Sequence, residues 1–239
     1  MKPPPRIGLL AILLCSLVFM PLASAQTVDL SAHVRVTKAR GASHSSRQSS
    51  ADVVVWLTPK ENPPPAPRGQ QNYTLAQKDK QFIPHILVVR TGSNVDFPNL
   101  DPFYHNVFSL FNGKRFDLGL YEAHTHRAVL FDREGVSYIF CNIHPDMGAV
   151  VVSLSTPYFG VSTRDGDIKI PGVPAGSYRL NIWAENVAVD RLNALSREVD
   201  VSPANTDLGT FDLQASGDIM THHQNKFGEN YTPAPNDSY

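Results

Sequence analysis

Three side chains that bind metals follow one another at short, even spacing: Cys141, His144 and Met147. They offer a thiolate, an imidazole and a thioether, and a loop with this spacing can turn all three toward one point. A second imidazole, His105, lies upstream at the start of an apolar segment. Soft thiolate and thioether ligands select copper, and imidazole accepts both Cu(I) and Cu(II). These residues therefore predict a copper site.

The rival metal for this donor set is zinc. Structural zinc sites use Cys and His and make little use of Met. Two His, one Cys and a weak axial Met are instead typical of a blue-copper electron-transfer site. Taken singly, a lone Cys is often a small buried hydrophobe, and a lone Met or His is often an ordinary core or surface residue. Because all four types coincide here, we interpret them as ligands of one copper ion.

The elements that must position these ligands are short strands. Apolar runs are short, rich in Val, Ile and aromatic residues, and separated by turn signals, and no segment shows sustained helical periodicity. With 19 Pro and 15 Gly, this pattern predicts an all-β protein built of β-sandwiches. The predicted strands are Val28–Lys38, Val53–Thr58, Ile83–Arg90, Asn94–Phe97, His105–Leu110, Ala128–Phe131, Val136–Cys141, Ala149–Leu154, Asp167–Ile170, Ser177–Glu185 and Glu198–Val201.

Residues 1–25 have the pattern of a cleavable signal peptide. Lys2 and Arg6 precede the apolar run Ile7–Leu22, and small residues end at Ala25, after which we predict cleavage. The run is short for a membrane span, so no integral membrane segment is expected after cleavage. The mature protein would be periplasmic or secreted. It would keep a single thiol, which in an oxidising compartment is a liability unless it is buried or bound to metal.

Charge and motif content argue against other classes of function. The formal net charge is −1, without the clustered Lys and Arg that a phosphate backbone requires, so nucleic acid is not an expected partner. No Ser/His/Asp arrangement, phosphate loop or spaced carboxylate pair rises above chance. We therefore expect a protein that is not an enzyme.

Residues 77–154 resemble the cupredoxins. The segments that carry this resemblance are Phe82–Pro84, Val88–Phe97, His105–Val107 and Val136–Met147. The loop that carries Cys141, His144 and Met147, here called the ligand loop, is most similar to the corresponding loops of amicyanin and pseudoazurin. These belong to a larger family of exported plastocyanin/azurin-like proteins, some of which are labelled methylamine-utilisation proteins. The resemblance implies a Greek-key β-sandwich that holds one type 1 copper through His105, Cys141, His144 and the axial Met147. It also implies that Asn106 fastens the two ligand loops together and positions backbone donors toward the Cys sulfur.

A second resemblance covers the flanks of that segment. Val28–Leu57 and Val161–Leu180 together look like a carboxypeptidase regulatory-like (transthyretin-like) sandwich, with an Asp-Gly turn followed by Gly-x-Pro-x-Gly-x-Tyr. We predict that the cupredoxin module is inserted into a loop of this sandwich. The alternative is two consecutive modules, with the first strands added to the cupredoxin. The predicted division is a signal peptide at 1–25, a first half-sandwich at 26–60, a Pro-rich connector at 61–76, the cupredoxin domain at 77–155, a second half-sandwich at 156–214 and a polar tail at 215–239.

The cupredoxin resemblance implies an exported one-electron carrier. Electrons would pass through His144 within an apolar patch of Pro102, Phe103 and Pro145, and the partners would be exported redox proteins such as a c-type cytochrome or a periplasmic dehydrogenase. Two alternatives stay open. One is a periplasmic copper carrier or storage protein, and the other is a surface-binding structural module with a secondary copper site.

Other histidines are weaker candidates for metal binding. His124 and His126 form an H-x-H pair, which on a strand would share one face. Multicopper oxidases flank the copper Cys with histidines, whereas Cys141 stands between Phe140 and Asn142. We expect the H-x-H pair on an exposed strand edge. Met220, His222 and His223 offer further soft donors, and we expect them in a solvated tail.

Overall fold

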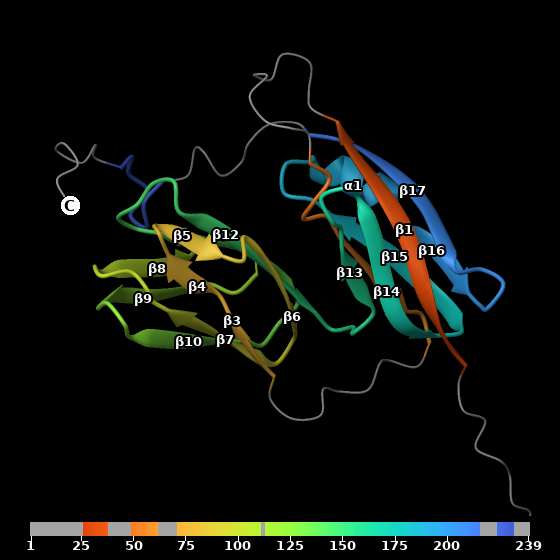
Figure 1. Ribbon diagram of the computed structural model, residues 1–239, viewed down its shortest axis with the longest axis horizontal. Helices are drawn as coiled ribbons and strands as arrows, with labels where there is room; N and C mark the ends of the chain where they lie inside the picture. Colours follow the sequence, from red (N-terminus) through yellow and green to blue (C-terminus); the bar gives the residue numbers. More distant parts are fainter. Residues whose placement is uncertain (1–25, 38–48, 62–70, 111–112, 216–223, 232–239) are drawn as a thin grey trace, which may run out of the picture.

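The described part of the chain is built almost entirely from strands, in two β-sandwiches that lie side by side (Figure 1). This computed structural model describes residues 26–37, 49–61, 71–110, 113–215 and 224–231. The architecture confirms the predicted all-β class. The predicted signal peptide at 1–25 and residues Met220, His222 and His223 lie outside the described residues.

The middle sandwich is formed by strands β3 to β12. Three strands, in the order β10-β7-β3, face five strands, in the order β6-β12-β11-β8-β9, and β4 and β5 form a separate two-stranded ladder. Their bounds are β3 Asn72–Thr74, β4 Ala76–Lys78, β5 Gln81–Ile83, β6 Ile86–Arg90, β7 Ser93–Pro98, β8 His105–Ser109, β9 Phe116–Tyr121, β10 His126–Phe131, β11 Gly135–Cys141 and β12 Gly148–Leu154.

The flanking sandwich joins strands from both ends of the described chain. Its sheets have the orders β14-β1-β17 and β13-β2-β15-β16. Its elements are β1 Thr27–Thr37, β2 Val54–Pro59, β13 Phe159–Val161, β14 Asp167–Pro174, β15 Gly176–Trp183, α1 Val189–Leu195, β16 Arg197–Val201 and β17 Asp207–Gln214. Strands before residue 60 thus pair with strands after residue 158, as an inserted middle sandwich requires. The domain boundaries and the transthyretin-like resemblance stay predictions.

Strands β6 and β12 contribute to two hydrophobic cores at once. Successive side chains of a strand point to opposite faces. In β12, Val151 packs in the core of the middle sandwich, whereas Val150 and Val152 pack in the core that includes the flanking sandwich. A strand buried on both faces reads as a continuous apolar run, as residues 149–154 do except at Ser153. The two sandwiches therefore share a packed core rather than a loose contact.

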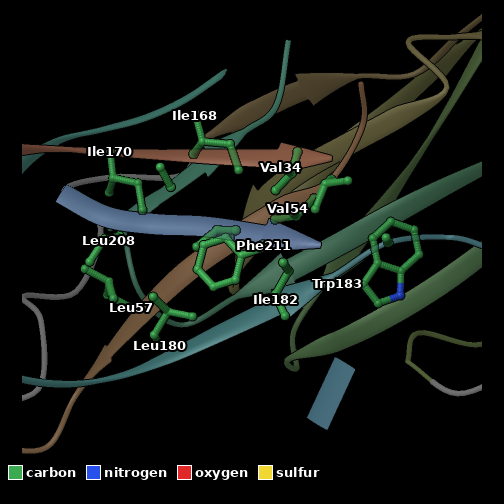
Figure 2. Packing of buried hydrophobic residues seen from close by; sticks show 14 of the residues in the cluster. Val34, Val54, Leu57, Ile168, Ile170, Leu180, Ile182, Trp183, Leu208 and Phe211 are labelled. Carbon is green, nitrogen blue, oxygen red and sulfur yellow. The ribbon is translucent and has the colours of Figure 1, made fainter. Parts of the chain in front are cut away.

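Figure 2 shows the flanking part of this shared core. Val34 and Phe211 come from the sheet of β1 and β17, and Leu57 and Ile182 come from the sheet of β2 and β15. All four side chains are buried. Trp183, at the end of β15, belongs to the same cluster as Val150 and Val152.

Some predicted elements differ from the observed ones. The strand predicted over residues 83–90 is wrong as a single element, because β5 ends at Ile83 and β6 begins at Ile86. Pro84 stands in the gap, and its missing N–H removes a ladder donor. Short α1 was not predicted either; Leu192 is its one buried side chain, so it shows no amphipathic stripe. Within the described ranges, no helix has the length and apolar character of a membrane span.

A charged contact joins the two sandwiches beside the shared core. The His85 ring lies with Nε2 2.7 Å from a Glu185 carboxylate oxygen and Nδ1 3.2 Å from the Gly148 carbonyl oxygen. Both ring nitrogens face acceptors, so the doubly protonated ring fits best. The hydrogen bond to Glu185 is the main reason that the pKa of His85 is raised above its ordinary value, although burial opposes the increase.

This contact predicts a pH-dependent contribution to stability. Because the folded-state pKa of His85 is raised, its stabilisation is fully present below the unfolded-state value near 6.5 and is lost as pH rises through the folded-state pKa. The His85→Gln variant should lose more unfolding free energy at pH 6 than at pH 9, by less than about 1 kcal/mol since the ring is partly exposed. Urea unfolding at both pH values measures this. In a Glu185→Gln background the pH-dependent difference should shrink, because Glu185 makes the largest contribution to the raised pKa of His85; an unchanged difference would assign it to another group.

Candidate metal centre

The β8–β11 ladder places two of the predicted ligands close together. His105 begins β8 and Cys141 ends β11, and Cys141 is paired with Val107 in the antiparallel register. His144 follows on the loop after β11. Backbone hydrogen bonds close this loop: Cys141 N–H donates to the Met147 carbonyl at 3.1 Å, and Met147 N–H donates to the His144 carbonyl at 3.2 Å.

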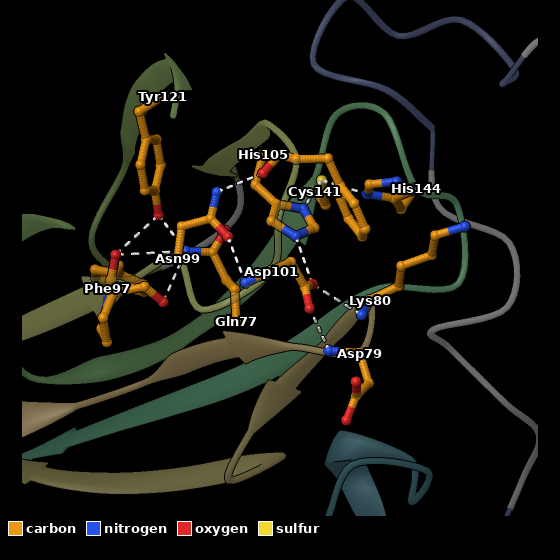
Figure 3. A network of polar contacts seen from close by, with 12 residues as sticks. Gln77, Asp79, Lys80, Phe97, Asn99, Asp101, His105, Tyr121, Cys141 and His144 are labelled. Carbon is orange, nitrogen blue, oxygen red and sulfur yellow. Dashed lines mark hydrogen bonds and ion pairs between the residues drawn. The ribbon is translucent and has the colours of Figure 1, made fainter. Parts of the chain in front are cut away.

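The donor atoms of His105, Cys141 and His144 lie within 4.8 Å of one another. Nδ1 of His105 is 3.6 Å from the Cys141 sulfur, and Nδ1 of His144 is 3.5 Å from it (Figure 3). Metal ions sit at roughly 2.0–2.1 Å from imidazole nitrogen and about 2.3 Å from thiolate sulfur. One ion can therefore contact all three atoms, and the donor set fits a metal.

Met147 is buried on the same loop, with 1% of its surface exposed. It belongs to the cluster of buried residues that also contains Cys141. The loop thus carries its thioether into the middle sandwich rather than to solvent. The role of Met147 as a fourth ligand stays a prediction.

Burial keeps both candidate imidazoles neutral. It lowers the pKa of His144 to about 4, helped by the neighbouring His105 ring and by Lys80. Burial also lowers the pKa of His105, against the opposing effect of Asp101. At pH 7 each ring therefore keeps a lone pair for a metal.

The Cys141 sulfur is fully buried and faces backbone donors. Burial raises the pKa of the thiol, while the backbone N–H groups of Asn106, Ile143 and His144 oppose the increase. Without metal the group is a thiol at pH 7, and a metal that binds the thiolate must displace its proton. The three N–H groups then stabilise the anionic sulfur.

Asn106 connects strand β8 to the ligand loop through its main chain. Its carbonyl accepts the Asn142 N–H at 3.1 Å. Its side-chain amide instead donates to Asp117 of β9 at 2.9 Å. The backbone and side chain of this residue thus link three segments around the site.

The segment 224–231 lies against the ligand loop, where sequence reasoning expected a solvated tail. Tyr231 donates its hydroxyl hydrogen to the Cys141 carbonyl at 2.7 Å. Lys226 donates its backbone N–H to the Asn142 side-chain oxygen at 2.9 Å, and its ammonium group lies 2.8 Å from Asp117. These polar contacts join residues far apart in sequence. The low hydrophobic content of residues 215–239 predicted a solvated tail and gave no indication of such contacts.

Sequence reasoning also missed Asp101, which is buried next to His105. Its carboxylate oxygen is 2.9 Å from His105 Nε2. Burial would raise the pKa of Asp101, but hydrogen bonds from His105 and from the Lys80 and Asp79 backbone outweigh it and lower the pKa. The sequence offered one indication of this contact, because Asp101 is an acidic residue four positions before the predicted ligand His105.

The H-x-H pair does not form a second site of this kind. His124 has a positive φ of 60° in the turn before β10, and His126 begins that strand. Both are exposed, and His126 Nδ1 lies 2.6 Å from an Asp96 carboxylate oxygen. Across the described ranges, His105, Cys141 and His144 are the one group of His, Cys and acidic side chains close enough to share a metal.

An apolar cleft of about 610 Å³ opens beside His144. It is lined by Lys80, Pro102, Phe103, Tyr104, Ile143 and His144. Phe103 packs against both imidazoles, with ring centroids 5.3 Å from His105 and 5.7 Å from His144. Pro145 is exposed on the same loop but is not part of the lining. His144 is thus the candidate ligand that reaches a surface depression.

Comparison with known proteins gives a likeness of fold. No family model matches the chain, and no curated protein matches it. Among solved structures, it is similar to the Cu-containing nitrite reductase NirK from Thermus scotoductus SA-01, with 19% identity and a TM-score of 0.35 over 37% of this chain and 24% of that chain. It is also similar to a purple cupredoxin from Nitrosopumilus maritimus, with 22% identity and a TM-score of 0.31 over 35% of this chain and 98% of that one.

A point mutant of amicyanin in its oxidised state shows a comparable likeness. The identity is 19% and the TM-score 0.33, over 35% of this chain and 82% of amicyanin. The chain therefore spans about a quarter of the nitrite reductase and most of the two small cupredoxins. The similarity concerns the fold of about a third of the chain, and the particular subfamily stays a prediction.

Proposed function

We propose that this chain is an exported type 1 copper protein that carries single electrons between redox partners. The observation that supports it most is the convergence of two neutral imidazoles on one buried Cys sulfur, with all donor atoms within 4.8 Å. His105, Cys141 and His144 would hold copper, and the Met147 thioether would be a fourth, weaker ligand. Bound copper would supply a reversible one-electron couple between Cu(I) and Cu(II).

The chain's own residues support copper over zinc. The thioether of Met147 is buried on the ligand loop, and a soft thioether suits copper better than a structural zinc ion. His105 and Cys141 lie on strands, which would keep the ligand positions similar in both oxidation states of copper. Four ligands leave no open position for a substrate, which is why we propose a carrier and not an enzyme.

Electrons would pass through His144, which is half-buried at the edge of the apolar cleft. The small apolar lining around Phe103 and Ile143 suits a brief and weak docking encounter. The partner would be an exported redox protein such as a c-type cytochrome or a periplasmic dehydrogenase. The burial of Cys141 and Met147 disfavours ready metal exchange, so a copper carrier or storage role has less support.

Titration of the metal-free protein with Cu(II), followed by visible spectroscopy and metal analysis, tests this function. We expect an intense charge-transfer band that saturates at about one copper per chain. A mild reductant should bleach it reversibly. Cu(II) bound without strong colour would show that the thiolate is not in the trigonal plane of a type 1 site and would contradict the proposal.

The Met147→Leu variant is expected to keep copper and to raise the reduction potential. The thioether donates electron density that favours Cu(II), and its loss should shift the Cu(II)/Cu(I) preference about tenfold, or about 59 mV for one electron. Voltammetry of the variant and the wild type measures this shift. Leu and Met have similar volumes, so the metal-free fold should lose less than about 1.5 kcal/mol. Complete loss of copper, or an unchanged potential, would mean that Met147 is not an axial ligand.

A further inference from the structure

A buried carboxylate contacts the ring nitrogen of His105 that points away from the sulfur. Asp101 is 4% exposed and His105 is fully buried. The distance between Asp101 Oδ2 and His105 Nε2 is 2.9 Å, while His105 Nδ1 faces the Cys141 sulfur. Figure 3 shows Asp101 between the His105 ring and the turn at Asp79 and Lys80.

The surrounding backbone holds this carboxylate in place. The Asp79 N–H donates to one oxygen at 2.6 Å, and the Lys80 N–H donates to the other at 3.0 Å. The Asp101 N–H donates to the Asn99 side-chain oxygen at 3.1 Å, and the Asn99 amide donates to the Phe103 carbonyl at 2.7 Å. Asp101 is therefore fixed by the turn between β4 and β5 and by its own loop.

We propose that Asp101 is a positioning residue for His105, which fixes the ring and stabilises Cu(II) over Cu(I) through the hydrogen bond to Nε2. The inference rests on the proposed copper site and goes beyond its ligand set. An ionised carboxylate can only accept a hydrogen bond, so the ring proton belongs on Nε2 and the lone pair on Nδ1 faces the site.

The same hydrogen bond alters the ligand's strength. A carboxylate that accepts the distal ring proton makes the imidazole a stronger donor. Its negative charge also lies in a buried region, where electrostatic interactions are weakly screened. Both effects favour Cu(II), the more highly charged oxidation state, over Cu(I). The expected consequences are a lower reduction potential and tighter Cu(II) binding than His105 alone would give.

Comparison of Asp101→Asn with Asp132→Asn tests the proposal. Asp132 is a matched control. Like Asp101, it is an aspartate whose carboxylate contacts a nitrogen of a basic side chain, here the Lys114 ammonium group at 3.0 Å, but it lies on the exposed surface. Loss of such a hydrogen-bond partner costs roughly 10- to 100-fold in metal affinity. We expect Asp101→Asn to weaken Cu(II) binding at least about tenfold relative to Cu(I) binding. This change corresponds to a rise in the reduction potential of at least about 59 mV. The Asp132→Asn protein should match the wild type.

The outcomes separate this inference from the proposed function. A wild-type protein without a charge-transfer band would overturn the copper function itself. A wild type with the band, and an Asp101→Asn variant that is folded and has the same potential and Cu(II) affinity, would overturn only the role of Asp101. A purely structural role would lower the melting temperature and leave the potential unchanged.

A measurement on the unmutated protein covers the case in which Asp101→Asn does not fold. Nitrogen-15 NMR of the diamagnetic Cu(I) form reports which ring nitrogen of His105 carries the proton. We expect a slowly exchanging proton on Nε2, hydrogen-bonded to Asp101. A proton on Nδ1, or a rapidly exchanging proton on Nε2, would overturn the proposal.

Discussion

Replacing Cys141 with serine is expected to abolish the intense thiolate-to-copper absorption and to weaken Cu(II) binding by more than about 100-fold. Loss of a residue that merely contacts a ligand costs roughly 10- to 100-fold in affinity, and the loss of a ligand exceeds that. A buried serine hydroxyl stays protonated and is not a soft donor. The visible spectrum and the Cu(II) affinity of the variant measure both effects.

The control for this variant is Ala149→Ser. Ala149 is fully buried in the same core cluster as Cys141, so the change places a serine hydroxyl in a similar environment without removing a ligand. It should cost roughly 1–3 kcal/mol of stability and leave the colour unchanged. Cys141 is the single cysteine after residue 25, so no second thiol can replace it. Retained colour in the Cys141→Ser protein would therefore disprove the ligand assignment.

The Val150→Asp substitution should cause the largest loss of stability, at least about 4 kcal/mol. Val150 is fully buried in the core that the two sandwiches share. A carboxylate at this position would be buried without a partner, which is among the most destabilising changes known. Since β12 follows the ligand loop directly, copper binding should weaken as well. Urea unfolding, followed by signals from both sandwiches, measures the loss.

Val189→Asp is the matched control, because this valine is 68% exposed at the start of α1. It should change stability by no more than about 0.5 kcal/mol. If the sandwiches share a core, unfolding of the Val150→Asp protein should remain one transition for both. Loss of the flanking sandwich alone, with the copper site intact, would show that the shared core is weaker than its packing indicates.

The convergence of His105, Cys141 and His144 could be predicted because most of its information is local. Cys141, His144 and Met147 share one short loop, and the strand predicted for residues 136–141 ends where the loop begins. His105 required only the prediction that it starts a strand that can pair with another. The all-β class followed from short apolar runs separated by turn residues.

Asp101 could not be found in this way, because its role depends on distant and weakly patterned segments. Its carboxylate is held by the turn between β4 and β5, two strands of three residues each that carry little alternation. Lys226 and Tyr231 contact the site through hydrogen bonds to residues 84 and 90 positions away in sequence. Such hydrogen bonds produce no periodic pattern in the sequence. Local sequence patterns report burial well and polar networks poorly.

Strand β17 was missed for a different physical reason. Its buried residues are Leu208, Phe211 and Leu213, so the alternation shifts by one position in the middle. The register with β1 is irregular at the same place, where Asp207 pairs with Ser31 and Thr210 pairs with His33. An extra residue in a strand breaks the two-residue period that identifies it. A strict search for alternation therefore overlooks this strand.

The burial of Cys141 also determines how the metal-free protein withstands oxidants. Oxidation to sulfenic acid and exchange with other disulfides both require an accessible thiolate. Cys141 has no exposed surface, and burial keeps its thiol protonated. The fold itself therefore protects the sulfur of the metal-free chain from oxidation.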